Sequence, residues 1–319
     1  MAVCRNGDPV PEALRDSVTA IGNFDGVHLG HQALIREAME KAEHEGRPSG
    51  VLTFEPHPRA FFDPGHSHFR ITPGATRLKL FARLGLDAVF LRRFDAAMAG
   101  TAAEDFVGGL LKGELAVSAI VVGTDFHFGR GRSGTPAVLR ELGMRFGLDV
   151  CLVEAVAQDG ASISSSRIRA ALEDGDIGLA NALLGYRWFV AGEVVHGDKR
   201  GRTLGFPTAN VRLEDGCRLK YGIYAVRMAT AAGAIHGGVA SFGRRPTFDN
   251  GAPLLETYLF DFSGDLYGRT VEVEFVAWIR GEERFASADA LVARMETDKA
   301  EALEMLRAAS SRAERSVIG

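Results

Sequence analysis

One segment constrains the fold of this chain more than any other. An apolar run at 17–22 leads into a glycine-rich loop at 22–30, and apolar residues then recur at helical spacing over 32–45. A strand that enters a helix through such a loop lets backbone N–H groups approach a phosphate, and the helix N-terminus adds a partial positive charge. The segment therefore predicts a binding site for the phosphates of a nucleotide.

Two histidines, His28 and His31, lie where this helix begins. Residues three apart in a first helical turn share one face, so both imidazoles can point at one ligand. The residues alone leave two other interpretations open, a tight turn with two surface histidines and a weak metal pair. The metal pair is incomplete, because a zinc site takes three or four protein ligands.

The first half of the chain alternates short apolar runs with longer amphipathic runs. We expect strands at 17–22, 49–54, 88–91, 119–122 and 150–156, and helices near 31–46, 75–85, 102–113 and 136–146. This βαβα order predicts a Rossmann-like α/β domain, with a parallel sheet covered by helices. Ligands bind beyond the carboxyl ends of the strands in such sheets, where the loop at 22–30 would lie.

The second half has a different pattern. After a short helical stretch at 167–184, runs rich in β-branched or aromatic residues follow at 189–195, 223–228, 235–241, 254–260 and 270–278. Several short strands separated by glycine-rich turns predict a small antiparallel β-barrel. Ala, Leu and Met recur at helical spacing over 288–309 and predict a C-terminal helix packed on that barrel. We place the boundary between two domains at Leu184 and Gly185.

The composition limits the classes of partner. A length of 319 residues allows two domains, and a formal charge of −4 provides no broad positive surface for nucleic acid. Three cysteines without metal-ligand spacing predict free thiols in a reducing compartment. Neither an N-terminal apolar leader nor a run of 18 apolar residues is present. We expect a cytoplasmic protein that binds neither membrane nor nucleic acid, as a monomer or weak homo-oligomer.

The loop at 22–31 reads Gly-Asn-Phe-Asp-Gly-Val-His-Leu-Gly-His. It resembles the His-x-Gly-His signature of the nucleotidyltransferases, and its full wording is most similar to the prokaryotic bifunctional FAD synthetases. Those enzymes join a riboflavin kinase to an FMN adenylyltransferase, and the resemblance extends over nearly the whole chain. It implies an FMN adenylyltransferase domain at 1–184 and a riboflavin kinase domain at 185–319.

Three further blocks match the adenylyltransferase. On the residues alone, His57 between two prolines can be structural, Asp125 can hold a nucleotide hydroxyl or cap a turn, and one serine of 164–166 can cap a helix. Three hydroxyls followed by Arg169 suit phosphate oxygens better, because arginine offers a planar fork of donors. The family often has other residues at His127, Thr135 and Ser166. The resemblance implies catalytic roles for His28, His31 and Arg169, flavin binding by His57 and Pro58, and nucleotide binding by Gly22, Asn23, Phe24, Gly26, Gly30, Asp125, Ser164, Ser165 and Ser166.

The second half carries the wording of the riboflavin kinase motif at 197–210. Thr208 and Asn210 offer neutral oxygens on one side of an extended segment, and such oxygens suit Mg²⁺, although a hairpin loop with polar turn residues also fits. Read alone, Glu256 is an outward residue of a strand and Arg280 belongs to a solvated charged loop. The resemblance implies that Glu256 is the catalytic base, that Arg280 contacts the flavin or its phosphate, that Thr208 and Asn210 bind the metal, and that nucleotide is bound by Gly197, Gly201, Arg202 and Gly205.

The predicted function is two reactions in sequence. The C-terminal domain phosphorylates riboflavin to FMN, and the N-terminal domain transfers an adenylyl group to FMN to give FAD and pyrophosphate. Both use ATP and Mg²⁺. One alternative keeps only the riboflavin kinase, with the other domain binding flavin nucleotide. A flavin-responsive regulator would need a nucleic-acid-binding module, and no basic stripe or helix-turn-helix motif appears in this sequence. A different nucleotidyltransferase would explain the first half alone.

Overall fold

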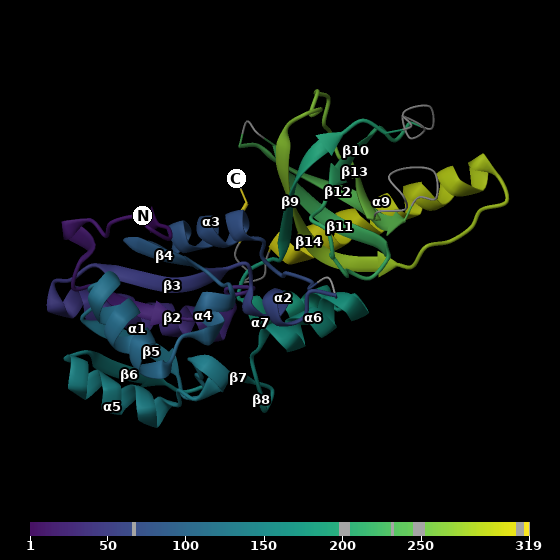
Figure 1. The fold of residues 1–319 in the computed structure, drawn as a ribbon. Helices are drawn as coiled ribbons and strands as arrows, with labels where there is room; N and C mark the ends of the chain where they lie inside the picture. The colour runs from purple at the N-terminus through teal and green to yellow at the C-terminus, as the bar shows by residue number, and fades with distance from the viewer. Residues whose placement is uncertain (66–67, 198–204, 231–232, 245–252, 311–315, 319) are drawn as a thin grey trace. The chain divides into compact units, whose positions relative to one another are not determined.

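The structure is a computed structural model of the chain, and it describes residues 1–65, 68–197, 205–230, 233–244, 253–310 and 316–318. The chain forms two compact units (Figure 1). The first consists of Met1–His68 and Thr72–Ser164, and the second of Phe69–Ile71 and Ser165–Gly319. Among the described residues, no helix has the length and apolar character that crossing a membrane requires.

A six-stranded parallel sheet forms the centre of the first unit, in the order β1-β4-β3-β2-β5-β6. The order reverses beside β2, because β3 and β4 follow it on one side and β5 and β6 lie on the other. The loops that leave β2 and β5 therefore flank the crevice where ligands bind in sheets of this kind. The strands are β1 Ala2–Cys4, β2 Val18–Ile21, β3 Ser49–Glu55, β4 Ala88–Arg93, β5 Ala119–Gly123 and β6 Asp149–Val153.

The parallel α/β sheet expected from the sequence is confirmed. The edge strand β1 was not expected, because three residues carry no readable alternation. The helices of this unit are α1 Leu29–Glu45, α2 Pro58–Phe62, α3 Gly74–Leu84, α4 Ala96–Gly100 and α5 Pro136–Phe146. Short elements complete it: η1 Glu12–Leu14, η3 Arg130–Arg132, β7 Ala157–Gln158 and β8 Ala161–Ser162.

The helix expected at 102–113 is a π-helix, η2, at Asp105–Glu114. Its last turn closes through a bond from the Leu115 N–H to the Leu110 carbonyl, five residues back, at 2.9 Å. Phe106, Val107, Leu110 and Leu111 are its buried residues. The spacing of apolar residues indicates which face of a helix is buried. The wider turn of a π-helix buries nearly the same residues as an α-helix, so the sequence pattern does not distinguish the two.

A closed antiparallel barrel, in the order β10-β13-β12-β11-β14-β9, forms the centre of the second unit and confirms the expected architecture. Helix α9, Ala288–Ser310, packs against β11, β12 and β14. The strands are β9 Phe189–Val195, β10 Thr208–Arg212, β11 Gly222–Ala229, β12 Ile235–Arg244, β13 Pro253–Leu259 and β14 Thr270–Arg280. The sequence indicated only an extended segment where β10 lies.

Two helices, α6 Ser165–Asp174 and α7 Ile177–Leu184, belong to the same compact unit as the barrel. The fully buried Asn181 explains how α7 is attached. Its amide nitrogen donates to the Phe275 carbonyl at 3.1 Å, and its amide oxygen accepts from the Trp188 N–H at 2.7 Å. The compact units thus part near Ser164, and the division into functional domains at residue 184 stays a prediction.

Candidate active sites

The loop between β2 and α1 is buried and strained. Phe24, Asp25 and Val27 are at most 2% exposed. The φ angles of Phe24 and Val27 are 51° and 40°. Side chains rarely adopt such angles, and a β-branched residue such as Val27 is an outlier there. Strain of this kind persists only where the surroundings hold it, which is typical of functional loops.

The glycine at position 30 allows the backbone of the loop to approach the His28 ring closely. A Cβ atom on Gly30 would lie 3.2 Å from the His28 ring and 3.8 Å from the Ile163 carbonyl oxygen. The serine block that follows Ile163 therefore starts beside the beginning of α1. At Gly26, φ is 91°, and its N–H donates to the Thr72 hydroxyl at 2.8 Å. Asn23 is exposed, so its side chain is open to a ligand.

The two histidines form a stacked pair, with ring centroids 3.6 Å apart and an angle of 17° between the rings. His28 is the N-cap residue of α1, because its Nδ1 accepts a hydrogen bond from the His31 N–H at 3.3 Å. In the neutral ring the proton is then on Nε2, which can donate to a phosphate oxygen. The buried ring of Phe24 packs against the edge of the His31 ring at 5.2 Å, so Phe24 supports the pair from the core.

Burial keeps both imidazoles neutral near pH 7. It lowers the pKa of His28 to about 4, against an opposing contribution from Asp25. Burial also lowers the pKa of His31 well below its usual range, and electrostatic repulsion from Arg77 and from the protonated form of His28 lowers it further. A bound phosphate would favour the protonated forms.

Arg77, which was not expected from the sequence, braces this loop from α3. It is 3% exposed, and its Nη1 donates to the Asn23 carbonyl at 2.7 Å. Its Nη2 donates to the Phe54 carbonyl at 3.1 Å and to Glu55 Oε2 at 3.0 Å. One guanidinium therefore joins the ends of β2 and β3. An arginine in the first turn of an amphipathic helix is ordinary, so no local signal identified it.

The loop after β5 presents Asp125, which is exposed. A Cβ atom on Gly123 would lie 2.8 Å from Asp125 Oδ1, so glycine there makes room for the carboxylate. The Asp125 carbonyl lies 2.8 Å from His127 Nδ1. Thr135, where the family often has aspartate, is the N-cap of α5, and its hydroxyl accepts from the Val138 N–H at 3.3 Å. Threonine at this position therefore still provides a side chain that caps the helix.

His57 and Pro58 form the start of α2. His57 is the N-cap, and its Nδ1 accepts from the Arg59 N–H at 3.1 Å. A cluster of aromatic side chains follows directly and was not identified from the sequence. The rings of Phe61 and Phe62 lie 5.6 and 5.7 Å from the Phe94 ring. Phe62 is 69% exposed, so an aromatic face is open to a planar ligand.

The serine block and Arg169 belong to the start of α6. Ser164 ends the first compact unit, and Ser165 begins the helix in the second. Ser166 is exposed, whereas Arg169 is 6% exposed. The Arg169 Nε donates to the Phe69 carbonyl at 2.6 Å, which fixes the orientation of its guanidinium.

In the barrel, the strand register brings Glu256 and Asn210 together. Antiparallel β10 and β13 pair Asn210 with Glu256 and Thr208 with Tyr258. Side chains directly opposite one another lie on the same face, and Thr208 shares that face because it is two residues from Asn210. A Cβ atom on Gly197 would collide with the Asn210 amide. Glycine at 197 therefore makes room for this amide, which is 5% exposed.

Two other residues of the motif, Gly201 and Arg202, lie outside the described residues. Gly205 is described and has a φ of 85°, a conformation that favours glycine. It is exposed and lies in the turn that leads into Phe206 and Thr208.

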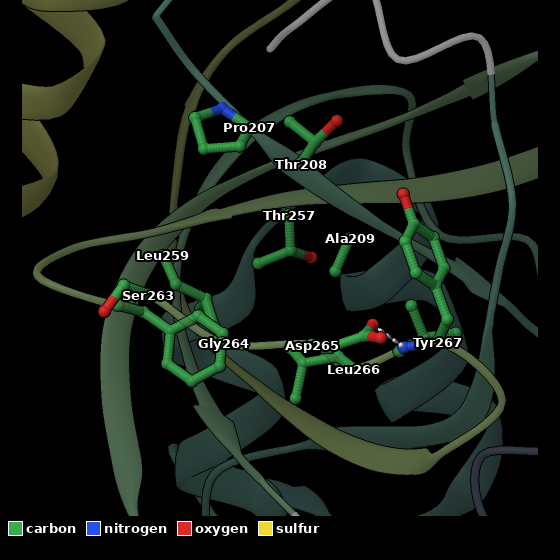
Figure 2. Close-up of a pocket in the computed structure, with 12 residues that line it drawn as sticks. Pro207, Thr208, Ala209, Thr257, Leu259, Ser263, Gly264, Asp265, Leu266 and Tyr267 are labelled. Atoms are coloured by element: carbon green, nitrogen blue, oxygen red, sulfur yellow. Dashed lines mark hydrogen bonds between the residues drawn. The ribbon is translucent and has the colours of Figure 1, made fainter.

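Two pockets share Thr208. The first, of about 620 Å³, is lined from β13 by Thr257 and Leu259, and from the following loop by residues that include Asp265 and Tyr267 (Figure 2). This loop was not selected from the sequence. The second pocket, of about 440 Å³, is lined from β13 by Glu256 and Tyr258. Alternate residues of one strand therefore face two different pockets.

The first pocket contains a buried hydroxyl without a partner. Thr257 is 1% exposed, and its Oγ1 has no hydrogen-bond partner in the described part of the chain. Figure 2 shows Thr257 among the lining residues, with Ala209 and Leu259 labelled nearby. A buried hydroxyl normally has a partner, so this one is available to a ligand. The Tyr267 ring stacks on His196 with centroids 4.0 Å apart.

The second pocket has an apolar wall and a charged clamp. Phe206, Ile223, Phe285 and Met295 contribute to its lining. Arg280, which also lines it, is paired through two bonds with Asp298 of α9. The bond from Nε to Oδ1 is 2.8 Å and the bond from Nη2 to Oδ2 is 2.7 Å, and Asp298 is 2% exposed. The Arg280 Nη1 donates to the Gly281 carbonyl at 2.9 Å.

Two family models match the chain in separate segments. A model described as FAD synthetase matches residues 10–167, and a model described as riboflavin kinase matches residues 184–306. The two matches follow the order expected from the motifs.

Curated relatives match over most of their length. A bifunctional riboflavin kinase/FMN adenylyltransferase of Escherichia coli K12 is 40% identical over 90% of this chain and 92% of the relative. One of Bacillus subtilis is 38% identical over 92% of this chain and 94% of the relative. A solved structure described as a macrolide-efflux protein from Streptococcus pneumoniae is 32% identical, with a TM-score of 0.85, and the match covers 95% of this chain and 99% of that one.

Proposed function

This chain belongs to the family of bifunctional riboflavin kinase/FMN adenylyltransferases, and we propose that each compact unit carries one of the two reactions. The barrel phosphorylates riboflavin to FMN with ATP. The parallel-sheet unit transfers the adenylyl group of a second ATP to FMN, which gives FAD and pyrophosphate. The observation that carries the kinase assignment is the opposition of Glu256 and Asn210 beside two pockets that share Thr208.

We assign the two barrel pockets to different substrates. The second pocket combines an apolar wall with Glu256, which suits the flavin ring and its ribityl chain. The first has the unpartnered Thr257 hydroxyl and a wall that includes Ser263 and Asp265, which suits an adenine nucleotide. Thr208 lines both, so the γ-phosphate would meet the flavin hydroxyl beside it.

Glu256 is the proposed base. It orients the 5′-hydroxyl of the ribityl chain and accepts its proton as the oxygen attacks the γ-phosphorus of ATP. A carboxylate is a weak base for an alcohol, but a loose phosphoryl-transfer transition state demands little of the base until late in the reaction. Positioning is therefore the larger contribution of Glu256.

Thr208 and Asn210 are the proposed ligands for Mg²⁺. The residues fit this ion, because both offer neutral oxygen atoms and the glycine at 197 leaves space for the Asn210 amide. The ion would neutralise charge on the phosphates during transfer.

In the parallel-sheet unit, a phosphate oxygen of FMN attacks the α-phosphorus of ATP, and pyrophosphate leaves. The nucleophile is already ionised, so the protein needs no covalent intermediate. It has to align two anions and stabilise the charge on the leaving group. We assign this task to the N–H groups of the loop at 22–30 and to His28 and His31. For Arg169, which lies on α6 of the second unit, the phosphate contact stays a prediction. The neutral His28 ring can donate from Nε2 because its Nδ1 caps the helix.

For the flavin of this second reaction we infer a binding face at α2. His57 and Pro58 fix the direction of the loop, and the exposed Phe62 ring offers a surface on which an isoalloxazine ring can stack. The Phe24 ring packs against His31 from the core, and the Phe24 backbone belongs to the proposed phosphate-binding loop.

The test is incubation of the purified chain with riboflavin, ATP and Mg²⁺, followed by chromatography of the flavins over time. We expect FMN to accumulate first and FAD to follow. FMN without FAD would favour the alternative in which only the kinase is retained. Release of neither product would contradict both assignments.

The described cysteines, Cys4, Cys151 and Cys217, are free thiols, which supports a cytoplasmic location. With a formal charge of −4, we infer no nucleic-acid partner. We infer a monomer or weak homo-oligomer, which sedimentation velocity at several protein concentrations would test.

A further inference from the structure

Three side chains of the parallel-sheet unit converge in a cluster to which the proposed reactions assign no metal-binding role, although His57 also belongs to the proposed flavin-binding face. Asp25, His57 and His68 each offer one ligand atom, and these atoms lie within 4.8 Å of one another. Asp25 is 2% exposed and His57 is 6% exposed, whereas His68 is half-buried and gives solvent access. They come from three separate loops, so their convergence is a property of the folded unit.

We propose that Asp25, His57 and His68 form a binding site for a divalent transition-metal ion of the zinc class. Two imidazole nitrogens and one carboxylate oxygen are the donor set that such ions prefer, whereas Mg²⁺ prefers oxygen donors alone. Three protein ligands leave a fourth position open to solvent or to an anion.

The spacing is close to what such an ion requires. A tetrahedral ion with bonds of about 2.0 Å holds its ligand atoms about 3.3 Å apart. The three side chains therefore need to close by at most about 1.5 Å. The rings of His57 and His68 already face each other, with centroids 4.6 Å apart and an angle of 35°.

Neighbouring groups hold two of the ligands in place. Asp25 Oδ1 accepts from the Thr72 N–H at 3.0 Å and from its hydroxyl at 3.4 Å. These bonds orient the carboxylate as outer-shell partners do at metal sites. His57 lies between Pro56 and Pro58, which restrict the backbone on both sides.

One hydrogen bond of His57 opposes metal binding and lowers the expected affinity of the site. His57 Nδ1 accepts from the Arg59 N–H, so the proton of the neutral ring is on Nε2. For Nε2 to bind a metal, this proton has to move to Nδ1 through solvent, and the cap bond to Arg59 is lost. The loss of one helix cap weakens affinity about fivefold. The site therefore binds more weakly than a preformed one but is not abolished.

The test uses the whole chain without a histidine tag, freed of metal with a chelator. Zn²⁺ is titrated by calorimetry, and Co²⁺ by the visible absorption that a protein site gives it. We expect one equivalent of either ion per chain. Binding should persist in about a hundredfold excess of Mg²⁺, and displacement by Mg²⁺ would contradict the nitrogen donors.

Three variants locate the ion. His57→Asn removes the imidazole but keeps a side chain that caps α2, and His68→Asn removes the second imidazole. His44→Asn is the matched control, because His44 is exposed near the end of α1. We expect at least about tenfold weaker binding in the first two variants and wild-type binding in the control. Equal affinity in all four proteins, or no binding by the wild type, would overturn the proposal.

Discussion

Glu256 on β13 lies directly opposite Asn210 on β10 in the antiparallel ladder of the barrel. This pairing brings a carboxylate and a neutral amide oxygen to one face of the two strands, from positions that lie 46 apart in the sequence. Thr208 follows on the same face, where the two pockets adjoin. A base, a metal ligand and two substrates can therefore meet at one transferred phosphate.

Replacing Glu256 tests the proposed base. In Glu256→Gln the side chain keeps its size but cannot accept the hydroxyl proton, so we expect kcat for FMN formation to fall by about 10²-fold or more. Adenylylation of supplied FMN should stay within about twofold of wild type, because that reaction is assigned to the other unit. A variant that still makes FMN at the normal rate would reject the role of Glu256.

The Thr257 hydroxyl allows a sharper test of the nucleotide pocket. An unpaired buried hydroxyl destabilises the free protein, so Thr257→Val should leave unfolding free energy unchanged or raise it by up to about 1 kcal/mol. If ATP supplies the missing partner, the KM for ATP in the kinase reaction should rise about fivefold or more. Steady-state kinetics and urea unfolding check the two effects together. A stable variant with unchanged KM would remove Thr257 from the site.

The paired hydrogen bonds between Arg280 and Asp298 predict that Asp298 positions the Arg280 guanidinium. Asp298→Asn leaves the buried guanidinium without its carboxylate, so we expect the unfolding free energy of the barrel unit to fall by about 3 kcal/mol. This pair between β14 and α9 lines the pocket that we assign to the flavin, so the KM for riboflavin should rise more than kcat falls. The control is Glu301→Gln on the same helix, whose pairing with Arg294 at 3.7 Å is only partly buried and therefore weak. Equal effects in both variants would contradict this role.

The buried His28 predicts an acid-dependent loss of stability. Its pKa is about 4 in the folded protein and about 6.5 when unfolded, so the unfolded state binds the extra proton between these values. Stability contributed by the neutral ring is therefore present above about pH 6.5 and is lost as the pH falls toward 4. Between about pH 7.5 and pH 5 the loss is about 2 kcal/mol.

The His28→Asn variant isolates that effect. Asparagine also caps a helix but does not titrate, so the difference in unfolding free energy between wild type and variant should shrink by about 2 kcal/mol over this range. Urea unfolding of the parallel-sheet unit at both pH values measures it. A difference that does not change with pH would show that His28 titrates normally in the folded state.

Repeating patterns in the sequence predicted both architectures. Long amphipathic runs located α1, α3, α5 and α9 to within a few residues, and the strands of both sheets were expected except for β1, β10 and the short β7 and β8. The element β10 is short and starts directly after Pro207, and its membership of the barrel depends on partners far away in the sequence. The π-helix was expected as an ordinary helix, because only the hydrogen-bond register distinguishes them.

Residues of the candidate sites could be proposed from the sequence where they belong to one continuous motif. The capping bond of His28, the brace of Arg77 and the pairing of Asp298 with Arg280 were not, because each depends on residues that approach only in the folded chain. The same holds for the exposed Phe62, whose ring packs against Phe94. Sequence motifs predicted the groups that react, and the structure adds neighbouring groups that can orient them.

The most direct test of the central claim is a mixing experiment with two variants. The His28→Ala variant changes the proposed adenylyl-transfer site, and the Glu256→Gln variant changes the proposed kinase site. Each variant alone should convert riboflavin to FAD at no more than about 1% of the wild-type rate. Mixed together with riboflavin, ATP and Mg²⁺, they should make FAD, because FMN released by one protein is used by the other. A mixture that forms no FAD, although each variant retains its other reaction, would contradict two independent sites on one chain.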